Sequence, residues 1–376
     1  MRRGEQRIDE PDVLILGPVP PPFGGVSVHL SRLVPLLERA GLNVAVLNHF
    51  SSAEGPGVVG ALKKNPLNYY HFPKKFRPRI VHYHHARWAH LVATALGKRS
   101  SDARYIVTLH AGQVANESPL TSKNALVSRI TRWALSRFDT VIVVNPKIAS
   151  ALKRHLDKQR IEVLPAFVEA ENDQLDTYEP EIEAFLNAGR VLVVSAYAIQ
   201  FDGHHEVYGL DNAIEGFANV ASTREDLRLA IFVARRPTRP KGRRYLASLE
   251  RRLSDAGLRQ RALIVFGLPL LPALRHNVIY VRPTRVDGDA VSVREAQAAG
   301  VPVIASNVVQ RPPGVVLFQT GNVADLSDTL RAALDDSAPP RRPTRDETER
   351  PLINEFADQL IRLYHTELAL QAGSGE

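Results

Sequence analysis

Two acidic residues eight positions apart, Asp287 and Glu295, have the types and spacing most suited to chemistry. They lie in RPTRVDGDAVSVREAQAAGVPVIAS (residues 282–306), a pattern typical of a strand, a loop, a helix ending at Gly300 and another strand. One acid falls in the loop and the other about one turn into the helix. N–H groups at a helix N-terminus bind anions, and carboxylates accept hydrogen bonds from hydroxyl groups. The segment therefore predicts a ligand that is anionic at one end and rich in hydroxyls at the other, as a nucleotide sugar is.

The elements that position these residues form a regular alternation of short apolar runs and longer amphipathic stretches. Continuous apolar strands alternating with helices indicate a parallel sheet covered on both faces. The pattern pauses in an acidic, irregular stretch near residues 169–189 and then restarts. We therefore predict an α/β protein of two Rossmann-like, doubly wound parallel-sheet domains, residues 1–185 and 186–348, facing across a cleft. Residues 349–376 are predicted to form a helix that packs back across the domains and a short polar tail.

Composition narrows the class of protein. The chain has 376 residues, of which 44% are hydrophobic and 23% charged, and this fits a globular protein of two domains. The absence of cysteine excludes disulfides and thiolate–metal sites, and the net charge of +8 favours anionic partners. The sequence contains neither an apolar run of about 18 residues nor a signal-peptide pattern at its N-terminus. We expect a cytoplasmic location, with the inner face of the cell membrane as a further option.

Several motifs together resemble one family. They are PPPFGGVSVHL (residues 20–30), VTLHAG (residues 107–112), FDTVIVVNPKIASALKRHL (residues 138–156) and DGDAVSVREAQAAGVPVIAS (residues 287–306). Over nearly its whole length the chain resembles the retaining glycosyltransferases of family 4, which have the GT-B fold. The resemblance implies transfer of a sugar from a nucleotide-diphosphate sugar to a glycan, lipid-linked or small-molecule acceptor. It also implies a role in cell-envelope polysaccharide or glycolipid synthesis, with neither a metal nor another cofactor.

The resemblance assigns roles to individual residues. Glu295 is expected to accept hydrogen bonds from ribose hydroxyls, Asp287 to contact the transferred sugar, and His110 to lie beside the donor sugar. Most family members have Glu where this chain has Asp287. The further donor-binding candidates are Gly24, Gly25, Arg282, Asp289, Ala290 and Val291. Glycines let a backbone approach phosphate closely, although a plain strand–helix turn explains Gly24-Gly25 equally well.

One family feature is missing from the second domain. Family members usually carry an Arg and a Lys after its first strand, both directed at the diphosphate, whereas here Tyr208 stands at the Lys position and no Arg precedes it. The arginines that could substitute are Arg235, Arg236, Arg282 and Arg285, and we expect Arg282 to do so because it abuts the motif strand. Two alternatives remain open: a non-catalytic GT-B protein that binds nucleotide sugar or glycan, and a nucleotide-sugar epimerase.

Two further clusters lie in the first half of the chain. His82, His84, His85 and His90 lack a nearby carboxylate, so we expect no metal site, and we place His84 and His85 on the acceptor side. The stretch from Lys63 to Arg79 has six basic and four aromatic residues and no acid. It predicts peripheral contact with an anionic membrane. Aromatic residues between cations also suit nucleic acid, which we do not expect as a partner.

Overall fold

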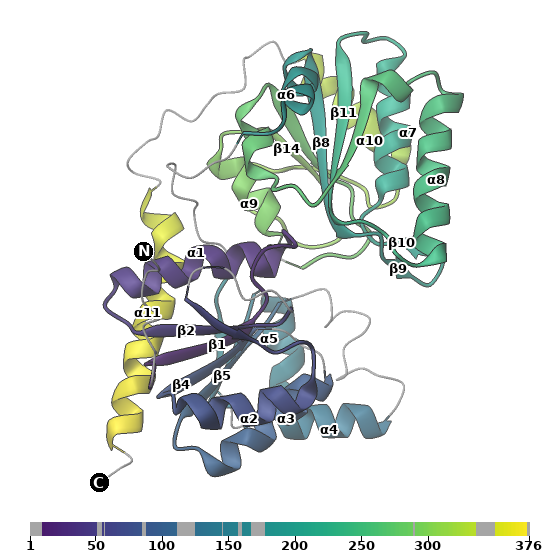
Figure 1. The fold of residues 1–376 in the computed structure, drawn as a ribbon. Coiled ribbons are helices and arrows are strands. Elements are labelled where there is room, and N and C mark those ends of the chain that lie inside the picture. Colours follow the sequence, from purple (N-terminus) through teal and green to yellow (C-terminus); the bar gives the residue numbers. More distant parts are fainter. Residues whose placement is uncertain are drawn as a thin grey trace, which may run out of the picture. The chain divides into compact units, whose positions relative to one another are not determined.

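The computed structural model describes residues 10–50, 55, 57–84, 88–110, 125–144, 146–156, 160–166, 177–288, 290–335 and 350–373. The contacts divide the chain into two compact units. Unit 1 contains residues 1–20, 26–168 and 351–376, and unit 2 contains residues 21–25 and 169–350. Each unit is an α/β layer structure built on a parallel sheet (Figure 1).

Unit 1 has a seven-stranded sheet in the order β3-β2-β1-β4-β5-β6-β7. The strands are β1 (Val13–Gly17), β2 (Val44–Asn48), β3 (Val58–Ala61), β4 (Ile80–His84), β5 (Arg104–Leu109), β6 (Thr140–Val143) and β7 (Arg160–Val163). The helices are α1 (Gly25–Arg39), α2 (Pro66–Phe76), α3 (Trp88–Gly97), α4 (Ala125–Leu135), α5 (Pro146–Lys153) and α11 (Arg350–Gly373). Every strand pair is parallel, and all residues of β1, β2 and β4 are buried, as continuous apolar strands require.

The final helix, α11, completes the core of unit 1. Leu363 and Tyr364 of α11 pack with Leu33 and Leu37 of α1 over β1. The buried carboxylate of Glu367 accepts hydrogen bonds from Arg104 Nε and Thr140 Oγ1, both at 2.7 Å. We expected this helix to pack across both domains, and these contacts place it on unit 1.

Unit 2 has a six-stranded parallel sheet in the order β12-β11-β8-β13-β14-β15. The strands are β8 (Arg190–Ala198), β11 (Leu227–Arg235), β12 (Ala262–Phe266), β13 (Val278–Arg282), β14 (Val303–Ser306) and β15 (Val316–Phe318), with the hairpin β9 (Phe201–Asp202) and β10 (His205–Glu206) after β8. The helices are α6 (Pro180–Asn187), α7 (Leu210–Ala221), α8 (Pro240–Asp255), α9 (Val291–Ala298) and α10 (Val323–Asp335). This is the Rossmann strand order, whose switch point, between β8 and β13, is where such sheets bind ligands.

The two faces of the unit 2 sheet have separate cores. Leu192 and Val194 of β8 pack with Phe217 of α7 on one face, whereas Val191 and Val193 pack on the other. Alternate residues of a strand point to opposite faces, so a strand buried on both sides must be apolar throughout. The predicted pair of Rossmann-like parallel-sheet domains is confirmed.

The division of the chain differs in detail from the expected boundary at residue 185. That residue lies inside α6, whose Leu186 is buried in the core of unit 2. Because a helix packs as one element, all of α6 belongs to unit 2. Of the helices that the structure describes, none is both long and apolar enough to span a membrane.

Candidate functional site

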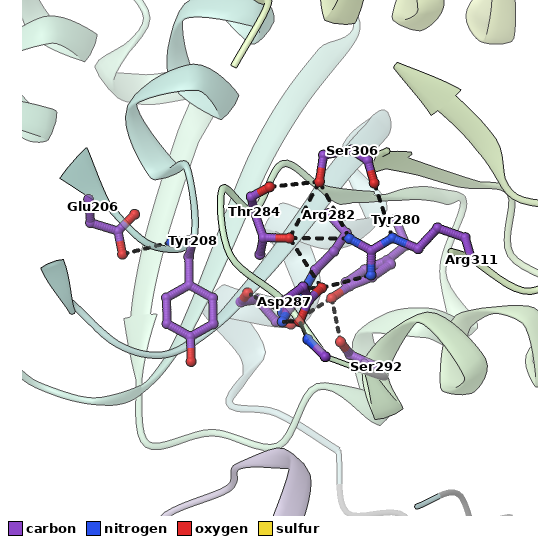
Figure 2. Close-up of polar contacts among 11 residues, drawn as sticks. Glu206, Tyr208, Tyr280, Arg282, Thr284, Asp287, Ser292, Ser306 and Arg311 are labelled. Atoms are coloured by element: carbon purple, nitrogen blue, oxygen red, sulfur yellow. Dashed lines mark hydrogen bonds and ion pairs between the residues drawn. The ribbon is translucent and has the colours of Figure 1, made fainter. Parts of the chain in front are cut away.

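Asp287 lies at the centre of a buried ionic cluster in the loop after β13. Its carboxylate accepts hydrogen bonds from Arg282 Nε and Nη2, each at 3.0 Å, and from Arg311 Nη1 at 2.7 Å. Thr284 Oγ1 donates to the same carboxylate at 3.1 Å (Figure 2). Burial alone would raise the pKa of Asp287, but the two guanidinium groups outweigh it and hold this pKa far below its ordinary value. Asp287 is therefore ionised at every pH at which the protein is handled.

Arg311 joins the end of β14 to the loop after β13 and was not anticipated from the sequence. Its Nε donates to the carbonyl of Ser306 at the end of β14, at 3.1 Å, and its Nη2 donates to Thr284 Oγ1 at 3.2 Å. On the other side, Arg282 Nη1 donates to the carbonyl of Ser195 in β8, at 3.2 Å. Two guanidinium groups against one carboxylate leave this cluster with one net positive charge.

Helix α9 begins directly after the cluster. The hydroxyl of Tyr280, in β13, donates to Ser292 Oγ in the first turn at 2.7 Å, which fixes that turn against the sheet. The N-cap residue is Ala290, which makes no side-chain capping hydrogen bond. Glu295, on the same helix, is 7% exposed. The predicted site residue Asp289 lies outside the described residues.

The glycine pair predicted to bind the donor lies beside this helix. A Cβ on Gly25 would be 3.8 Å from Val291 Cγ2, and one on Gly24 would be 2.5 Å from the ring of Tyr197 at the end of β8. Gly24 therefore has no room for a side chain. The structure thus brings together Gly25 and Val291, two residues that the sequence analysis assigned to one site, and places both among the contacts of unit 2.

The loop after β8 takes an arrangement that the sequence did not reveal. The buried carboxylate of Glu206 accepts hydrogen bonds from the backbone N–H groups of Tyr208 (3.1 Å) and Leu210 (3.2 Å), at the start of α7. Burial raises the pKa of Glu206 to about 7, and its hydrogen bonds with these N–H groups only partly offset that rise. The chain's own carboxylate thus occupies the N-terminus of α7, a position where helices commonly bind anions. Glu206 lies four residues before the first residue of α7, and this spacing was the available signal.

Most of the arginines considered as substitutes for the family's missing Arg and Lys have partners of their own. Arg285 forms a bidentate pair with Asp211, at 2.8 and 2.9 Å, and Arg282 is paired with Asp287. The ring of Tyr208 lies 5.3 Å from the guanidinium carbon of Arg282. Burial raises the pKa of Tyr208 to about 12, so this side chain is a neutral phenol. Arg235 is the exposed last residue of β11, and Arg236 follows it with its guanidinium carbon 4.2 Å from the ring centre of Phe266.

In unit 1 the structure connects His110 to a chain of buried imidazoles. His84 Nδ1 is 3.2 Å from His110 Nε2, and His84 Nε2 is 3.2 Å from His82 Nδ1. His82 continues the chain to Thr108 Oγ1 at 2.8 Å and to the hydroxyl of Tyr364 at 2.5 Å. His85 lies outside the described residues.

His82, His84 and their neighbour His29 are held in the uncharged form by burial, which lowers the pKa of each. Burial lowers the pKa of His82 to about 3, and the same cause lowers the pKa of His84 well below its ordinary value. Burial, with a smaller contribution from Arg32, lowers the pKa of nearby His29 to about 4. A chain of neutral imidazoles fixes ring orientations and tautomers relative to one another. Among the residues that the structure describes, no group of three or more His, Asp or Glu side chains is arranged to hold a metal.

Two parallel-sheet units, each with its candidate residues at the carboxyl ends of the strands, define a protein of the GT-B fold. The model "Glycosyltransferase Family 4" matches residues 23–172, and the model "Glycosyl transferases group 1" matches residues 196–336. The chain belongs to the glycosyltransferases.

Solved structures agree with this fold. Sucrose-phosphate synthase from Thermosynechococcus elongatus is 17% identical, with a TM-score of 0.70 over 96% of this chain and 100% of that one. A glycosyltransferase from Rickettsia africae is 13% identical, with a TM-score of 0.65 over 95% and 98%. The E. coli structure described as trehalose-6-phosphate bound with UDP-2-fluoro glucose is 12% identical, with a TM-score of 0.66 over 95% and 98%. No protein of curated function matches the sequence.

Proposed function

We propose that this protein is a retaining glycosyltransferase of family 4 that transfers a sugar from a nucleotide-diphosphate sugar without a metal ion. The acceptor is a glycan, a lipid-linked sugar or a small molecule in cell-envelope polysaccharide or glycolipid synthesis. The observation that carries this proposal is the buried, net positive cluster of Arg282, Asp287 and Arg311, in which Asp287 lies four residues before the helix that bears buried Glu295. The bound UDP-2-fluoro glucose of the E. coli structure supports UDP-sugars as the first donors to test.

The chemistry follows from how charge develops during transfer. As the bond to the sugar breaks, negative charge accumulates on the departing diphosphate, and fixed N–H groups and cations at the start of α9 stabilise that charge. Glu295 accepts hydrogen bonds from the ribose hydroxyls of the donor. The leaving phosphate takes the proton of the acceptor hydroxyl, which attacks from the same face, so no separate general base is needed.

The arrangement of Asp287 refines its part in this proposal. Both of its carboxylate oxygens already accept hydrogen bonds from arginines. We therefore assign Asp287 to positioning Arg282 and Arg311, whose net charge attracts the diphosphate. His110 remains the candidate for contact with the transferred sugar, and the neutral imidazoles of His84 and His82 hold its ring in place.

A second function has a specific observation in its favour. Tyr208 replaces a cation, and Glu206 occupies the helix terminus next to it, so diphosphate would find fewer positive groups here than in a typical member. A non-catalytic protein that binds a nucleotide sugar or glycan would need fewer such groups, because it need not stabilise the charge of a leaving group.

Donor binding is the first test. UDP-, GDP-, ADP- and TDP-sugars would be titrated against the wild type, Glu295→Ala and the control Arg251→Gln, whose exposed side chain lies on α8. A donor at a hundred times its Kd should stabilise the wild type and the control by about 2.7 kcal/mol. Glu295→Ala should lose this stabilisation by the donor. Excess EDTA should leave the stabilisation of the wild type unchanged. Lack of a shift with every donor would contradict the proposal.

Measuring turnover distinguishes a glycosyltransferase from a non-catalytic binding protein. NMR of the donor with candidate acceptors should show transfer with retention at the anomeric carbon, and slow donor hydrolysis without an acceptor. Binding without either reaction would favour the non-catalytic function. Release of an isomerised sugar in the absence of an acceptor would instead indicate an epimerase.

We also propose that unit 1 contacts the inner, anionic face of the cell membrane through α2 and its neighbours. Leu67 of α2 and Leu126 of α4 are each 64% exposed, and Trp88 of α3 is 48% exposed. Helix α3 packs against both α2 and α4, so these side chains belong to one layer of helices. Lys63, Lys64 and Lys75 are exposed in and before α2, and the Nζ of Lys74 lies 3.9 Å from the ring centre of Tyr70.

Vesicle binding tests this contact. Each lysine near an anionic surface contributes about 1 kcal/mol. Replacing Lys63, Lys64, Lys74 and Lys75 by Gln should therefore weaken sedimentation with phosphatidylglycerol vesicles by more than about tenfold. The charge-matched control replaces Arg243, Arg244, Arg251 and Arg252 of α8 by Gln. Equal loss in both variants would show only a general charge effect and would contradict a specific membrane face.

A further inference from the structure

A polar pocket lies at the edge of the unit 2 sheet opposite the candidate donor site. It is formed where β8, β11 and β13 begin, whereas the predicted donor-site residues lie near the carboxyl ends of the strands. Its volume is about 370 Å³, within the range of about 300–1,000 Å³ typical of small-molecule sites. The lining residues are Leu186, Asn187, Gly189, Arg190, Arg224, Asp226, Asn277 and Leu334.

Arg190 is the notable side chain of this pocket. Its Nε is buried and, within the described part of the chain, has no hydrogen-bond partner. The same holds for Nε of Arg228, which lies 3.7 Å from the position that a Cβ on Gly189 would take. Buried polar groups in folded proteins are nearly always hydrogen-bonded. Arg228 does not line the pocket, whereas Arg190 does, so the unpartnered nitrogen of Arg190 indicates a missing acceptor at this site.

The charges around the pocket point to an anion. Arg224 is paired with Asp226 at 3.6 Å and with Asp335 at 3.2 Å, and so uses both carboxylates of this region. Among the residues that line the pocket, two arginines against one carboxylate leave one positive charge in excess. Burial and the neighbouring Arg224 both lower the pKa of Arg190, with Asp226 only partly opposing them, as expected of a cation that lacks a counterion.

We propose that this pocket binds a phosphate monoester that also carries hydroxyl groups, such as a sugar phosphate. A planar guanidinium group matches the oxygens of a phosphate, and Arg190 is free of the competing pairs that hold Arg224. The exposed carboxylate of Asp226 and the exposed side chain of Asn277, both lining the pocket, can bind hydroxyl groups. The site is separate from the proposed donor site and does not depend on it.

Calorimetric titration of the full chain with glucose 6-phosphate and with inorganic phosphate, at fixed ionic strength, tests the proposal. Wild-type protein should bind glucose 6-phosphate saturably and more tightly than inorganic phosphate. Arg190→Gln should weaken this binding by at least about tenfold, the loss of one charge-assisted hydrogen-bonded pair. Arg251→Gln, on exposed α8, and Glu295→Ala, in the proposed donor site, should bind like the wild type.

Folding of the variant is checked by its thermal unfolding without ligand. Arg190→Gln should melt at the wild-type temperature or above it, because the substitution removes a partly buried charge that forms no direct ion pair with the described residues. Absence of saturable binding to the wild type, or equal binding to Arg190→Gln, would overturn the proposal. Binding lost in Glu295→Ala instead would assign the ligand to the donor site and would overturn it as well. Equal affinity for inorganic phosphate and glucose 6-phosphate would overturn the proposal that the ligand carries hydroxyl groups of a sugar.

Discussion

At the scale of single residues, Asp287 shows how a motif residue can be recognised from sequence while its partners are not. The spacing of Asp287 and Glu295 marked the segment, and the expected importance of Arg282 followed from its position beside the motif strand. Arg311, which donates to the same carboxylate, lies 24 residues further along the chain, in a loop without periodicity. Contacts between loops depend on how strands are ordered in the sheet, so local patterns cannot reveal them.

Replacing Asp287 by Asn should destabilise unit 2 strongly. The change leaves Arg282 and Arg311 buried with no carboxylate between them. Removing one partner of a buried ion pair costs about 3–5 kcal/mol. Urea unfolding should show this loss for Asp287→Asn, whereas Asp328→Asn, which breaks an exposed pair with Arg331, should change stability by less than about 0.5 kcal/mol. A loss below about 1 kcal/mol for Asp287→Asn would contradict a structural role for the cluster.

Glu206 should make stability fall as pH rises. Its pKa is raised to about 7 in the folded protein from its ordinary value of 4.5, so the folded state binds a proton more tightly than the unfolded state. The resulting stabilisation is complete below pH 4.5 and is lost as pH rises through about 7. Glu206→Gln, which stays neutral, should lack this decline.

The measurement is the difference in unfolding free energy between the wild type and Glu206→Gln across that range. Taking the difference cancels the contributions of the histidines and the other carboxylates to the pH dependence, because these groups titrate equally in both proteins. The variant should gain on the wild type steadily from pH 4.5 to 7 and keep a constant advantage above it. Parallel curves would mean that the Glu206 carboxyl group titrates normally.

At the scale of elements, the apolar strands were predictable, whereas the short strands β3 and β15 were not. The continuous apolar run RVLVVSAYA at residues 190–198 indicates a buried strand, and β8 forms over Arg190–Ala198. Strands β3 and β15 were missed because they are short edge strands that lack a continuous buried run. Helix α2, in the basic aromatic stretch, was also missed, because Pro66 and Pro73 obscure its pattern. Pro66 instead occupies the first helical turn, where proline is tolerated.

Gly209 connects two of these elements and should tolerate no side chain. It lies between the β9–β10 hairpin and α7 at φ +67°, where a Cβ would come within 2.0 Å of the carbonyl oxygen of Pro283. Gly257 has nearly the same conformation, φ +69°, but open space around it. Gly257→Ala should therefore report the backbone strain alone, about 1 kcal/mol.

Gly209→Ala should cost clearly more than Gly257→Ala, because a backbone carbonyl cannot move aside as a flexible side chain can. It should also weaken donor binding, since Pro283 lies in the loop that leads to Asp287. Thermal unfolding and the donor titration measure the two effects. Equal melting temperatures for the two alanine variants would show that the loops after β8 and β13 are not in close contact.

At the scale of the whole molecule, the two units have separate hydrophobic cores but are linked by the order of the chain. Each unit has its own core: one around β1 and α1, and two on the faces of the β8 sheet. However, unit 1 is completed by α11, which follows unit 2 in sequence. The amphipathic pattern predicted this helix but not the unit on which it packs. Such a pattern shows that one face of a helix is buried, and it does not identify the core that covers this face.

A chain ending at residue 349 should lose the fold of unit 1 and keep that of unit 2. The deletion removes the buried side chains of Leu360, Leu363, Tyr364 and Leu368 from the unit 1 core, along with the partner of Arg104 and Thr140. Each such side chain contributes about 1.5–3 kcal/mol, and their sum rivals the whole stability of a domain, about 5–15 kcal/mol. Hydrogen exchange should therefore show lost protection in β1, β4 and β5, with β8, β11 and β13 still protected. A chain ending at residue 373 is the control. If β1 and β4 stayed protected without α11, the helix would be an addition to unit 1 and not part of its core.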